Sequence, residues 1–295
     1  VEFGTGNQCV FGVTGASWGH NTIVCRVPPG QGTVNVVVTT AVARNPLASA
    51  AVPYTYAAPS VTTPPAPGKT DGTSSVVFVG NSFGVVGTGS ATVTLQASGA
   101  DCPITGRTHT QITCTLPAGQ GAALTVVISV GGLTTTSTVG YEKPSVTGYT
   151  ADGASPLGGN TVFINGDNFG VSQPSVFFDG DTCTYINHTF TRIACLSPSG
   201  SDSRTIRVGA GGQGSNTDIV WVYSLPTISD VQPGNGPTSG TDAAGDPVSI
   251  AVIGTDLGVS GTVTVGGQLC TPITSHQPNR VECALPVGQG LDQVV

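Results

Sequence analysis

The stretch GDNFGVSQPSVFFDGDTCTYINHTFTRIACLSPSG, residues 166–200, contains in order a Gly-x-x-Phe-Gly turn, two cysteines and a Pro-x-Gly turn. Between Cys183 and Cys195 lie His188 and the only Asn-x-Ser/Thr sequon of the chain, at Asn187. These residue types would suit a metal site, a redox pair, a glycan-bearing surface loop or a structural clasp. Each of these would give the protein a different function, and the features that recur elsewhere in the chain help to separate them.

The cysteines are the first sign of an internal repeat. The second cysteine of the stretch has counterparts at a spacing of roughly 85 residues, and each of them follows a partner cysteine after a short interval. The pairs are Cys9 with Cys25, Cys102 with Cys114, Cys183 with Cys195, and Cys270 with Cys283. A fixed period of this length predicts tandem copies of one fold.

Turn motifs recur in the same order as the cysteines. After the second cysteine of each pair comes a Pro-x-Gly turn, within RVPPGQG (26–32), TLPAGQG (115–121), LSPSGSD (196–202) and ALPVGQG (284–290). Before the first cysteine come GNSFG (80–84), GDNFG (166–170) and GTDLG (254–258). The copies meet at YAAP (56–59), YEKP (141–144) and YSLP (223–226). Because several kinds of motif keep one order, we expect all copies to share one topology.

Short runs rich in Val, Ile and Thr fill the space between these turns. Gly, Asn or Pro bounds them, as in SSVVFVG (74–80), LTVVISV (124–130) and PVSIAVIG (247–254). No segment has a 3.6-residue apolar stripe of helical length. About seven short strands in each copy predict an all-β fold built from small sandwiches. The aromatic rings of Tyr56, Tyr141 and Tyr223 are expected to close one end of each sandwich.

The order of these motifs resembles that of the IPT/TIG domain, an immunoglobulin-like β-sandwich, and the resemblance covers essentially the whole chain. It implies tandem immunoglobulin-like sandwiches in an elongated rod, with copies at 1–57, 58–143, 144–225 and 226–295. The first copy is expected to lack its opening strands and the last copy its closing one. The family includes extracellular segments of plexins and scatter-factor receptors, accessory domains of starch-acting enzymes and the dimerisation halves of Rel-type transcription factors. The resemblance therefore implies the fold much better than the function.

The paired cysteines favour structural disulfides over the other chemistries. A zinc site needs four ligands, whereas each copy offers two cysteines and at most one histidine in the same segment. A redox pair would favour a Cys-x-x-Cys spacing at a helix start, which no pair has. We predict four disulfides within the copies, Cys9–Cys25, Cys102–Cys114, Cys183–Cys195 and Cys270–Cys283, and hence an oxidising, extracellular or cell-surface setting.

Charge is scarce in this chain. Only 8% of the residues are charged, the formal net charge is −7, and Lys69 and Lys143 are the only lysines. This composition leaves no basic surface for a phosphate backbone, so nucleic acid is not an expected partner. No stretch approaches the roughly 18 apolar residues of a membrane span. Neither end reads as a natural terminus and Met is absent, so we expect the sequence to be part of a longer or processed chain.

Covalent glycans would explain how so uncharged a chain stays soluble. Asn187 lies in an Asn-His-Thr sequon in a segment predicted to be an exposed loop. The Thr-rich stretches VTTPPAP (61–67) and TTTST (134–138) are candidate O-glycan acceptors or, alternatively, a plain linker and a Thr-rich strand. The candidate threonines are Thr62, Thr63, Thr134, Thr135 and Thr136. Apart from glycans, no cofactor is expected.

Catalytic residues are not evident in the sequence. A hydrolase triad needs a nucleophile, a His and a carboxylate, but the cysteines are assigned to disulfides and the histidines to loops at the sandwich tips. The acids Asp167, Asp179 and Asp181 could serve glycosidase chemistry or calcium, yet Asp more often caps turns. The segment GAGGQG (209–214) has no following helix or anchoring Lys, so it is interpreted as a turn. We expect no enzyme activity.

The four histidines of the chain share one position type. Each lies between the paired cysteines of its copy, and they are His20, His109, His188 and His276. One interpretation is a pH-sensitive or metal-bridging contact between adjacent copies. The other is that the loops are polar, exposed and similar by repeat ancestry. Their spacing to the second cysteine varies, which favours the second interpretation.

These observations favour a non-enzymatic extracellular structural glycoprotein, the repeat unit of a fibre, appendage or adhesion stalk. The alternatives are an ectodomain segment of a cell-surface receptor or adhesion protein, or spacer domains of a secreted carbohydrate-active enzyme. The incomplete end copies are expected to be completed by polypeptide outside residues 1–295. Either the chain continues into further copies, or neighbouring molecules supply strands and self-associate head to tail into a fibre.

Overall fold

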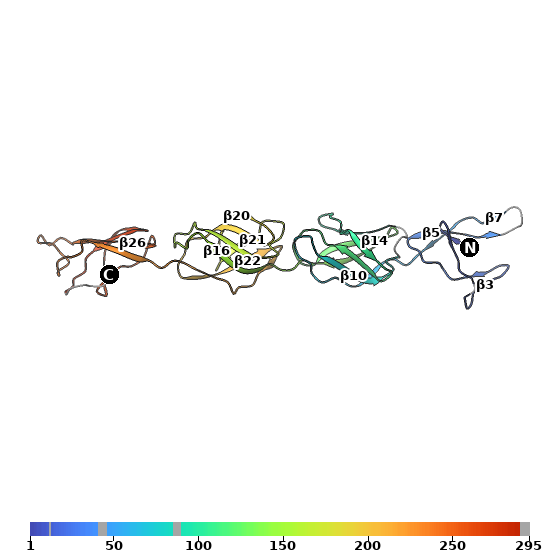
Figure 1. Cartoon of the computed structure of the whole chain (residues 1–295), viewed down its shortest axis with the longest axis horizontal. Helices are drawn as coiled ribbons and strands as arrows, with labels where there is room; N and C mark the ends of the chain where they lie inside the picture. Colours follow the sequence, from blue (N-terminus) through green and yellow to red (C-terminus); the bar gives the residue numbers. More distant parts are fainter. Residues whose placement is uncertain (12, 41–45, 85–89, 290–295) are drawn as a thin grey trace. The chain divides into compact units, whose positions relative to one another are not determined.

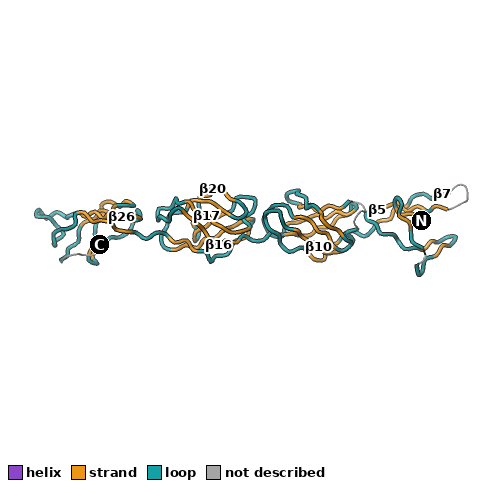
Figure 2. The backbone as a smooth tube through the Cα atoms, viewed as in Figure 1, coloured by secondary structure: helices purple, strands orange, loops and turns teal. Residues whose placement is uncertain are grey.

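The computed structural model describes the whole chain except residues 12, 41–45, 85–89 and 290–295 (Figure 1). Every regular element in the described residues is a β-strand, which confirms the all-β prediction (Figure 2). The chain forms two compact units. Unit 1 comprises Val1–Pro144, Asn168–Ser172 and Ala210–Gln213, and unit 2 comprises Ser145–Asp167, Gln173–Gly209 and Gly214–Val295.

The second copy, in unit 1, is a two-sheet sandwich. Its strands are β9 (Ser60–Thr63), β10 (Ser75–Asn81), β11 (Ala91–Leu95), β12 (Ile104–Arg107), β13 (Gln111–Thr115), β14 (Leu124–Val130) and β15 (Leu133–Val139). One sheet has the order β12-β13-β10-β9 and the other β11-β14-β15. Successive side chains of a strand point to opposite faces, and this alternation buries Val76 and Phe78 of β10 against Val126 and Ile128 of β14.

The first and last segments of the second copy are joined by their backbones. Gly68 pairs with Tyr141 in a parallel bridge, in which the Gly68 amide donates to the Gly140 carbonyl over 3.0 Å. The Glu142 amide donates in turn to the Gly68 carbonyl over 2.8 Å. The two ends of the copy are therefore held side by side.

The third copy repeats this plan. Its strands are β16 (Ser145–Ala151), β17 (Thr161–Asp167), β18 (Ser175–Phe178), β19 (Asp181–Thr182), β20 (Thr184–His188), β21 (Arg192–Leu196), β22 (Ser203–Ala210), β23 (Gln213–Gly214) and β24 (Val220–Val222). One sheet has the order β16-β17-β21-β20, and the other β19-β18-β22-β23 with β24 also paired to β22. Trp221, 1% exposed, packs edge-on against Phe178 and Tyr223 at the centre of this core.

The fourth copy, in unit 2, has a smaller core. Its strands are β25 (Thr227–Gln232), β26 (Ser249–Thr255), β27 (Thr264–Val265), β28 (Gln268–Leu269), β29 (Ile273–Gln277) and β30 (Arg280–Ala284). A sheet of order β25-β26-β30-β29 faces the hairpin β27-β28. Ile250, Cys270 and Cys283 form the buried cluster between them.

The first copy, in unit 1, buries fewer side chains. Its strands are β1 (Glu2–Phe3), β2 (Asn7–Gln8), β3 (Ser17–Trp18), β4 (Ile23–Val24), β5 (Thr33–Val37), β6 (Thr39–Thr40), β7 (Leu47–Ala48) and β8 (Val52–Thr55). The main sheet has the order β2-β1-β5-β8. Phe3 is buried and meets Tyr54 edge-on, whereas Phe11 and Trp18 are stacked on each other and exposed.

Each copy contains one disulfide. The Cα–Cα distances are 5.8 Å for Cys9–Cys25, 5.4 Å for Cys102–Cys114, 5.8 Å for Cys183–Cys195 and 5.5 Å for Cys270–Cys283. In the second, third and fourth copies the second cysteine lies on a central strand, β13, β21 or β30, and the first lies before or at the start of the hairpin partner of that strand. The bridge therefore crosses from the hairpin base into the core.

Candidate functional site

A tyrosine at the end of each of the first three copies is fastened to the Pro-x-Gly turn of the same copy. The tyrosine hydroxyl donates to a proline carbonyl, and we call this contact the tyrosine latch. The oxygen–oxygen distances are 3.0 Å for Tyr56 and Pro28, 2.6 Å for Tyr141 and Pro117, and 2.8 Å for Tyr223 and Pro198. The Tyr-x-x-Pro and Pro-x-Gly motifs that recur in the sequence thus supply the two partners of one contact.

The glycine of the turn makes room for the tyrosine ring. A Cβ added to Gly30, Gly119 or Gly200 would lie 2.3, 2.5 or 2.8 Å from the nearest ring atom. Burial raises the pKa of the hydroxyl in all three latches, because removal from water disfavours the phenolate. Because the tyrosine ring fills the space beside this glycine, a side chain larger than hydrogen at the glycine position would push the ring out of the latch.

The glutamine that follows this glycine reaches beyond its own copy. In unit 1 the Gln120 Oε1 accepts hydrogen bonds of 3.0 Å from the Val171 and Ser172 amides. At the equivalent position, the Gln31 Nε2 donates to the Ser90 carbonyl over 3.1 Å. We call these two side chains the glutamine clamps, because each binds the backbone of the copy that follows it in the sequence. Gln31 binds directly before β11, and Gln120 binds directly after Gly170.

The Gly-x-x-Phe-Gly turn that lies beside each clamp ends in a glycine for a steric reason. Gly84 and Gly170 have φ values of +74° and +83°, and each lies directly against a clamp. A Cβ on Gly84 would lie 2.2 Å from the Gln31 Oε1, and one on Gly170 would lie 2.1 Å from the Gln120 Oε1. Any other residue would both strain the backbone and displace the glutamine.

Backbones also approach closely beside each clamp. A Cβ on Gly32 would lie 2.3 Å from the Gly131 carbonyl oxygen, and a Cβ on Gly211 would lie 2.4 Å from the Gly121 nitrogen. All four glycines belong to unit 1 and have positive φ. The Gly-Gly turn interpreted from GAGGQG is confirmed, and its contact with Gly121 gives it a packing role.

Asn168, in the turn that receives Gln120, adds a further set of contacts in unit 1. Its Oδ1 accepts from the Thr70 amide over 3.3 Å, and its Nδ2 donates to the Glu142 carboxylate over 3.0 Å. Asn168 is 8% exposed, so its bond with the Thr70 amide is buried, whereas its bond with Glu142 is only partly buried. Nearby, the Gln213 Nε2 donates to the Tyr141 carbonyl over 3.1 Å.

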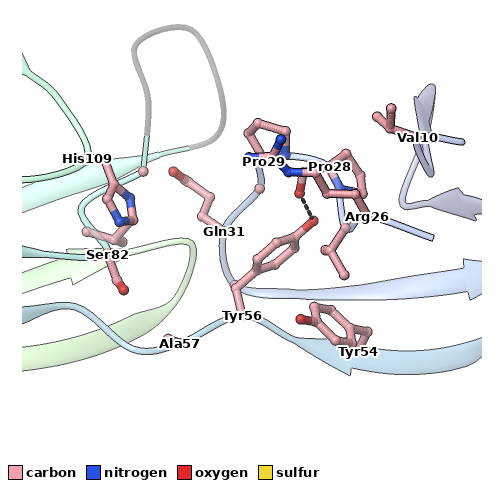
Figure 3. Close-up of a pocket in the computed structure, with 15 residues that line it drawn as sticks. Val10, Arg26, Pro28, Pro29, Gln31, Tyr54, Tyr56, Ala57, Ser82 and His109 are labelled. Atoms are coloured by element: carbon pink, nitrogen blue, oxygen red, sulfur yellow. Dashed lines mark hydrogen bonds between the residues drawn. The ribbon is translucent and has the colours of Figure 1, made fainter. Parts of the chain in front are cut away.

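A cavity of about 860 Å³ in unit 1 surrounds the first clamp. Gln31 lies between the Tyr56–Pro28 latch on one side and Ser82 and His109 on the other (Figure 3). Tyr54 meets Tyr56 edge-on, with ring centroids 5.2 Å apart. The cavity is thus lined by the same groups that make the latch and the clamp.

The histidines do not gather at one site. His188 lies on β20, where its Nδ1 is 2.8 Å from the Tyr185 hydroxyl, and His276 lies on β29, where its Nε2 is 2.9 Å from the Leu257 carbonyl. The prediction that the histidines occupy tip loops is therefore wrong for these two, because both belong to paired hairpin strands. His20 and His109 lie outside the strands.

The acidic residues likewise serve local structure. Asp179 has a positive φ of 50° in the turn between β18 and β19, and Asp181 pairs with Arg204 at 3.5 Å. No group of three or more His, Cys, Asp or Glu side chains that could hold a metal ion occurs among the described residues.

The predicted glycosylation residues lie on strands. Asn187 is exposed on β20, the edge strand of its sheet, so the expectation of a loop is wrong while that of exposure holds. Thr62 and Thr63 lie on β9 instead of in a linker, and Thr134 to Thr136 lie on β15. The roles of Gln31 and Gln120 were not predicted from the sequence, although the recurrence of Gly-Gln-Gly after the proline could have indicated both residues.

Two antiparallel sheets around a bridged core define the second and third copies as immunoglobulin-like sandwiches. The IPT/TIG domain model matches residues 60–142 and 144–221, which together make up more than half of the chain. The protein therefore belongs to the IPT/TIG domain family, as its motifs predicted. No curated protein matches the chain in sequence.

Several solved structures are similar in fold. The plexin A4 full extracellular region is 20% identical with a TM-score of 0.32, over 77% of this chain and 20% of that one. The surface glycan-binding protein PbSGBP-B from Prevotella bryantii is 14% identical with a TM-score of 0.36, over 56% and 42% of the two chains. The I9–I11 tandem from titin is 9% identical with a TM-score of 0.26, over 78% and 90%. This chain spans about a fifth of the plexin chain and less than half of the Prevotella protein.

Within the described part of the chain, no helix is long and apolar enough to cross a membrane.

Proposed function

We propose that this chain is a non-enzymatic spacer of an extracellular or cell-surface protein, in which clamped IPT/TIG copies hold other parts of an assembly at a set separation. The observation that carries the proposal is the glutamine clamp. Gln31 and Gln120 occupy equivalent places in two copies, and each side chain hydrogen-bonds to the backbone of the following copy. Such repetition is expected where neighbouring copies must keep one orientation.

The strength of a clamp is sufficient for this role. A hydrogen bond contributes about 1 kcal/mol net, and the two bonds at Gln120 are exposed and share one acceptor oxygen, so together they favour the bound side chain by roughly fivefold. Asn168 adds two bonds in the same region. The linker residues, such as Pro144 directly after the second copy, further restrict the backbone.

The extracellular placement rests on the disulfides and the scarcity of charge. Four bridges in one chain are typical of an oxidising compartment. We propose an N-glycan on Asn187, whose side chain is exposed on the edge strand β20. A glycan there would supply solubility and would also block pairing of this edge with a strand of another molecule.

Small-angle X-ray scattering of the secreted chain tests the spacer role. The double variant Gln31→Ala and Gln120→Ala should scatter as a more flexible particle than the wild type, with unchanged circular dichroism. Gln111→Ala is the matched control, because Gln111 is exposed on β13 within the second copy. Equal flexibility of the wild type, the double variant and the control would overturn the proposal.

A further inference from the structure

The third copy lacks the groups with which the second copy holds its successor. One backbone hydrogen bond that both copies make shows which of their positions are equivalent. The Gly119 amide donates to the Thr70 carbonyl over 3.0 Å, and the Gly200 amide donates to the Pro156 carbonyl over 2.9 Å. Pro156 therefore stands where the second copy has Thr70. Proline has no amide hydrogen, so it cannot make the bond that Thr70 donates to Asn168.

The clamp itself is also missing from the third copy. Ser201 follows Gly200 at the place where Gln120 follows Gly119. A serine side chain is too short to reach a following copy, and the Ser201 hydroxyl donates to the Asp202 carboxylate over 3.2 Å. The carbonyl of Ser201 accepts from the Arg204 side chain at 3.4 Å. Both polar groups of Ser201 are thus bonded within the third copy.

Two further replacements remove the remaining contacts of this kind. Asp202 stands in place of Gly121, and its exposed side chain accepts the hydrogen bond of Ser201 within the third copy. In the fourth copy Asp256 stands in place of Asn168, with φ values of 55° and 61°. A carboxylate accepts hydrogen bonds but donates none, so Asp256 cannot repeat the bond that Asn168 donates to Glu142.

The linker at this point is exposed to solvent. Ser224 follows the latch tyrosine Tyr223 where Glu142 follows Tyr141, so the carboxylate acceptor is also lost. The next residue, Leu225, is 80% exposed. The Ser224 amide still donates to the Ala154 carbonyl of the third copy over 2.8 Å. The apolar side chain of Leu225 is left in water, so nothing within the described residues packs over the linker beyond Ser224.

We infer that residues 225–226 form a hinge, about which the fourth copy reorients relative to the third, whereas Gln31 and Gln120 bind the backbone of the copy that follows them. Such a hinge lets a clamped spacer present its distal part over a range of angles. The inference uses the clamp on which the proposed function rests, but it concerns the linker that has none and is tested separately.

Residual dipolar couplings of backbone amides measure the hinge directly in the full chain. Amides of the third and fourth copies should require two different alignment tensors, with the fourth copy showing a different degree of order. A single tensor that fits both copies in the wild type would overturn the hinge. That result would leave the proposed function intact, because the spacer role is decided by the effect of removing Gln31 and Gln120.

A second experiment restores the missing contacts by mutation. The variant Pro156→Thr, Ser201→Gln, Asp202→Gly and Asp256→Asn restores four of the five groups of the second-copy arrangement, all except the carboxylate of Glu142. In this variant, a single alignment tensor should fit the amides of both copies. The control Ser199→Gln places a glutamine two residues earlier in the same loop and should leave them apart. Tensors that stay equally different in the four-fold variant, with native amide dispersion retained, would contradict the assignment of rigidity to these groups.

Discussion

The Tyr141 hydroxyl donates to the Pro117 carbonyl over 2.6 Å, and the ring that carries it lies against Gly119. This contact joins the end of the second copy to the turn from which the clamp residue Gln120 projects. The position of Gln120 is thereby fixed by a group at the closing end of the sandwich. The latch holds the turn in place, and the clamp residue on that turn binds the next copy.

Tyr141→Phe should destabilise the second copy by about 1–2 kcal/mol, because the buried Pro117 carbonyl loses its donor while the ring packing is kept. Chemical denaturation monitored by circular dichroism measures the change. Tyr149→Phe is the control, since Tyr149 packs on Trp221 in unit 2 and has no part in a latch. Equal effects of the two substitutions would argue against the latch.

Gly119→Ala should cost about 1–3 kcal/mol, since the added Cβ would lie 2.5 Å from the Tyr141 ring and the ring must move. Gly148→Ala is the matched change, because a Cβ on Gly148 meets no atom within 4 Å. Thermal unfolding of the two variants should separate them clearly. A stable Gly119→Ala protein would show that the turn and ring can part without loss.

The latch tyrosines should resist ionisation. Burial raises the pKa of Tyr56, Tyr141 and Tyr223 above the ordinary value of 10.0. A group whose pKa is raised in the folded state stabilises the fold below its unfolded pKa, and this contribution disappears as the pH rises through the folded pKa. Stability should therefore fall above pH 10. In an ultraviolet titration of phenolate, these three tyrosines should ionise above pH 10, and phenolate formation at all three below pH 10 would count against this.

The disulfides should all lie within copies. Non-reducing peptide mapping should recover Cys102 linked to Cys114 and Cys183 linked to Cys195, with no free thiol. Replacing Cys102 and Cys114 together by Ala should destabilise the second copy by roughly 3 kcal/mol, since the bridge restricts the unfolded chain. A bridge between Cys114 and Cys183 would refute the assignment.

Asn187 should carry an N-glycan when the chain is secreted from a eukaryotic cell. The mass should then exceed the 29.4 kDa of the bare polypeptide, and Asn187→Gln should remove the amide-linked part of the excess. Any excess that persists in this variant should map to Thr62, Thr63 or Thr134 to Thr136. A wild-type mass equal to that of the polypeptide would exclude both kinds of glycan.

The sequence predicted the repeat, the all-β class and the IPT/TIG family, because period, turn residues and strand composition are local properties. It did not predict the role of Gln120, whose partners Val171 and Ser172 are backbone amides far along the chain. Amide partners leave no mark in the residue types, so a side chain that binds them is hard to recognise. The strand position of Asn187 was missed for a related reason. Only its pairing with Ala194 on β21 makes that segment extended.

The parallel bridge between Gly68 and Tyr141 also determines how the second copy would respond to tension. Pulling the two ends of this copy apart drags these neighbouring segments in opposite directions along their length. The hydrogen bonds of Gly68 to Gly140 and to Glu142 are then loaded in shear and must break together, along with the Tyr141 latch. Bonds that share a load in this way resist force far better than bonds that open one after another. The same contacts that close the sandwich therefore make it a mechanically resistant link.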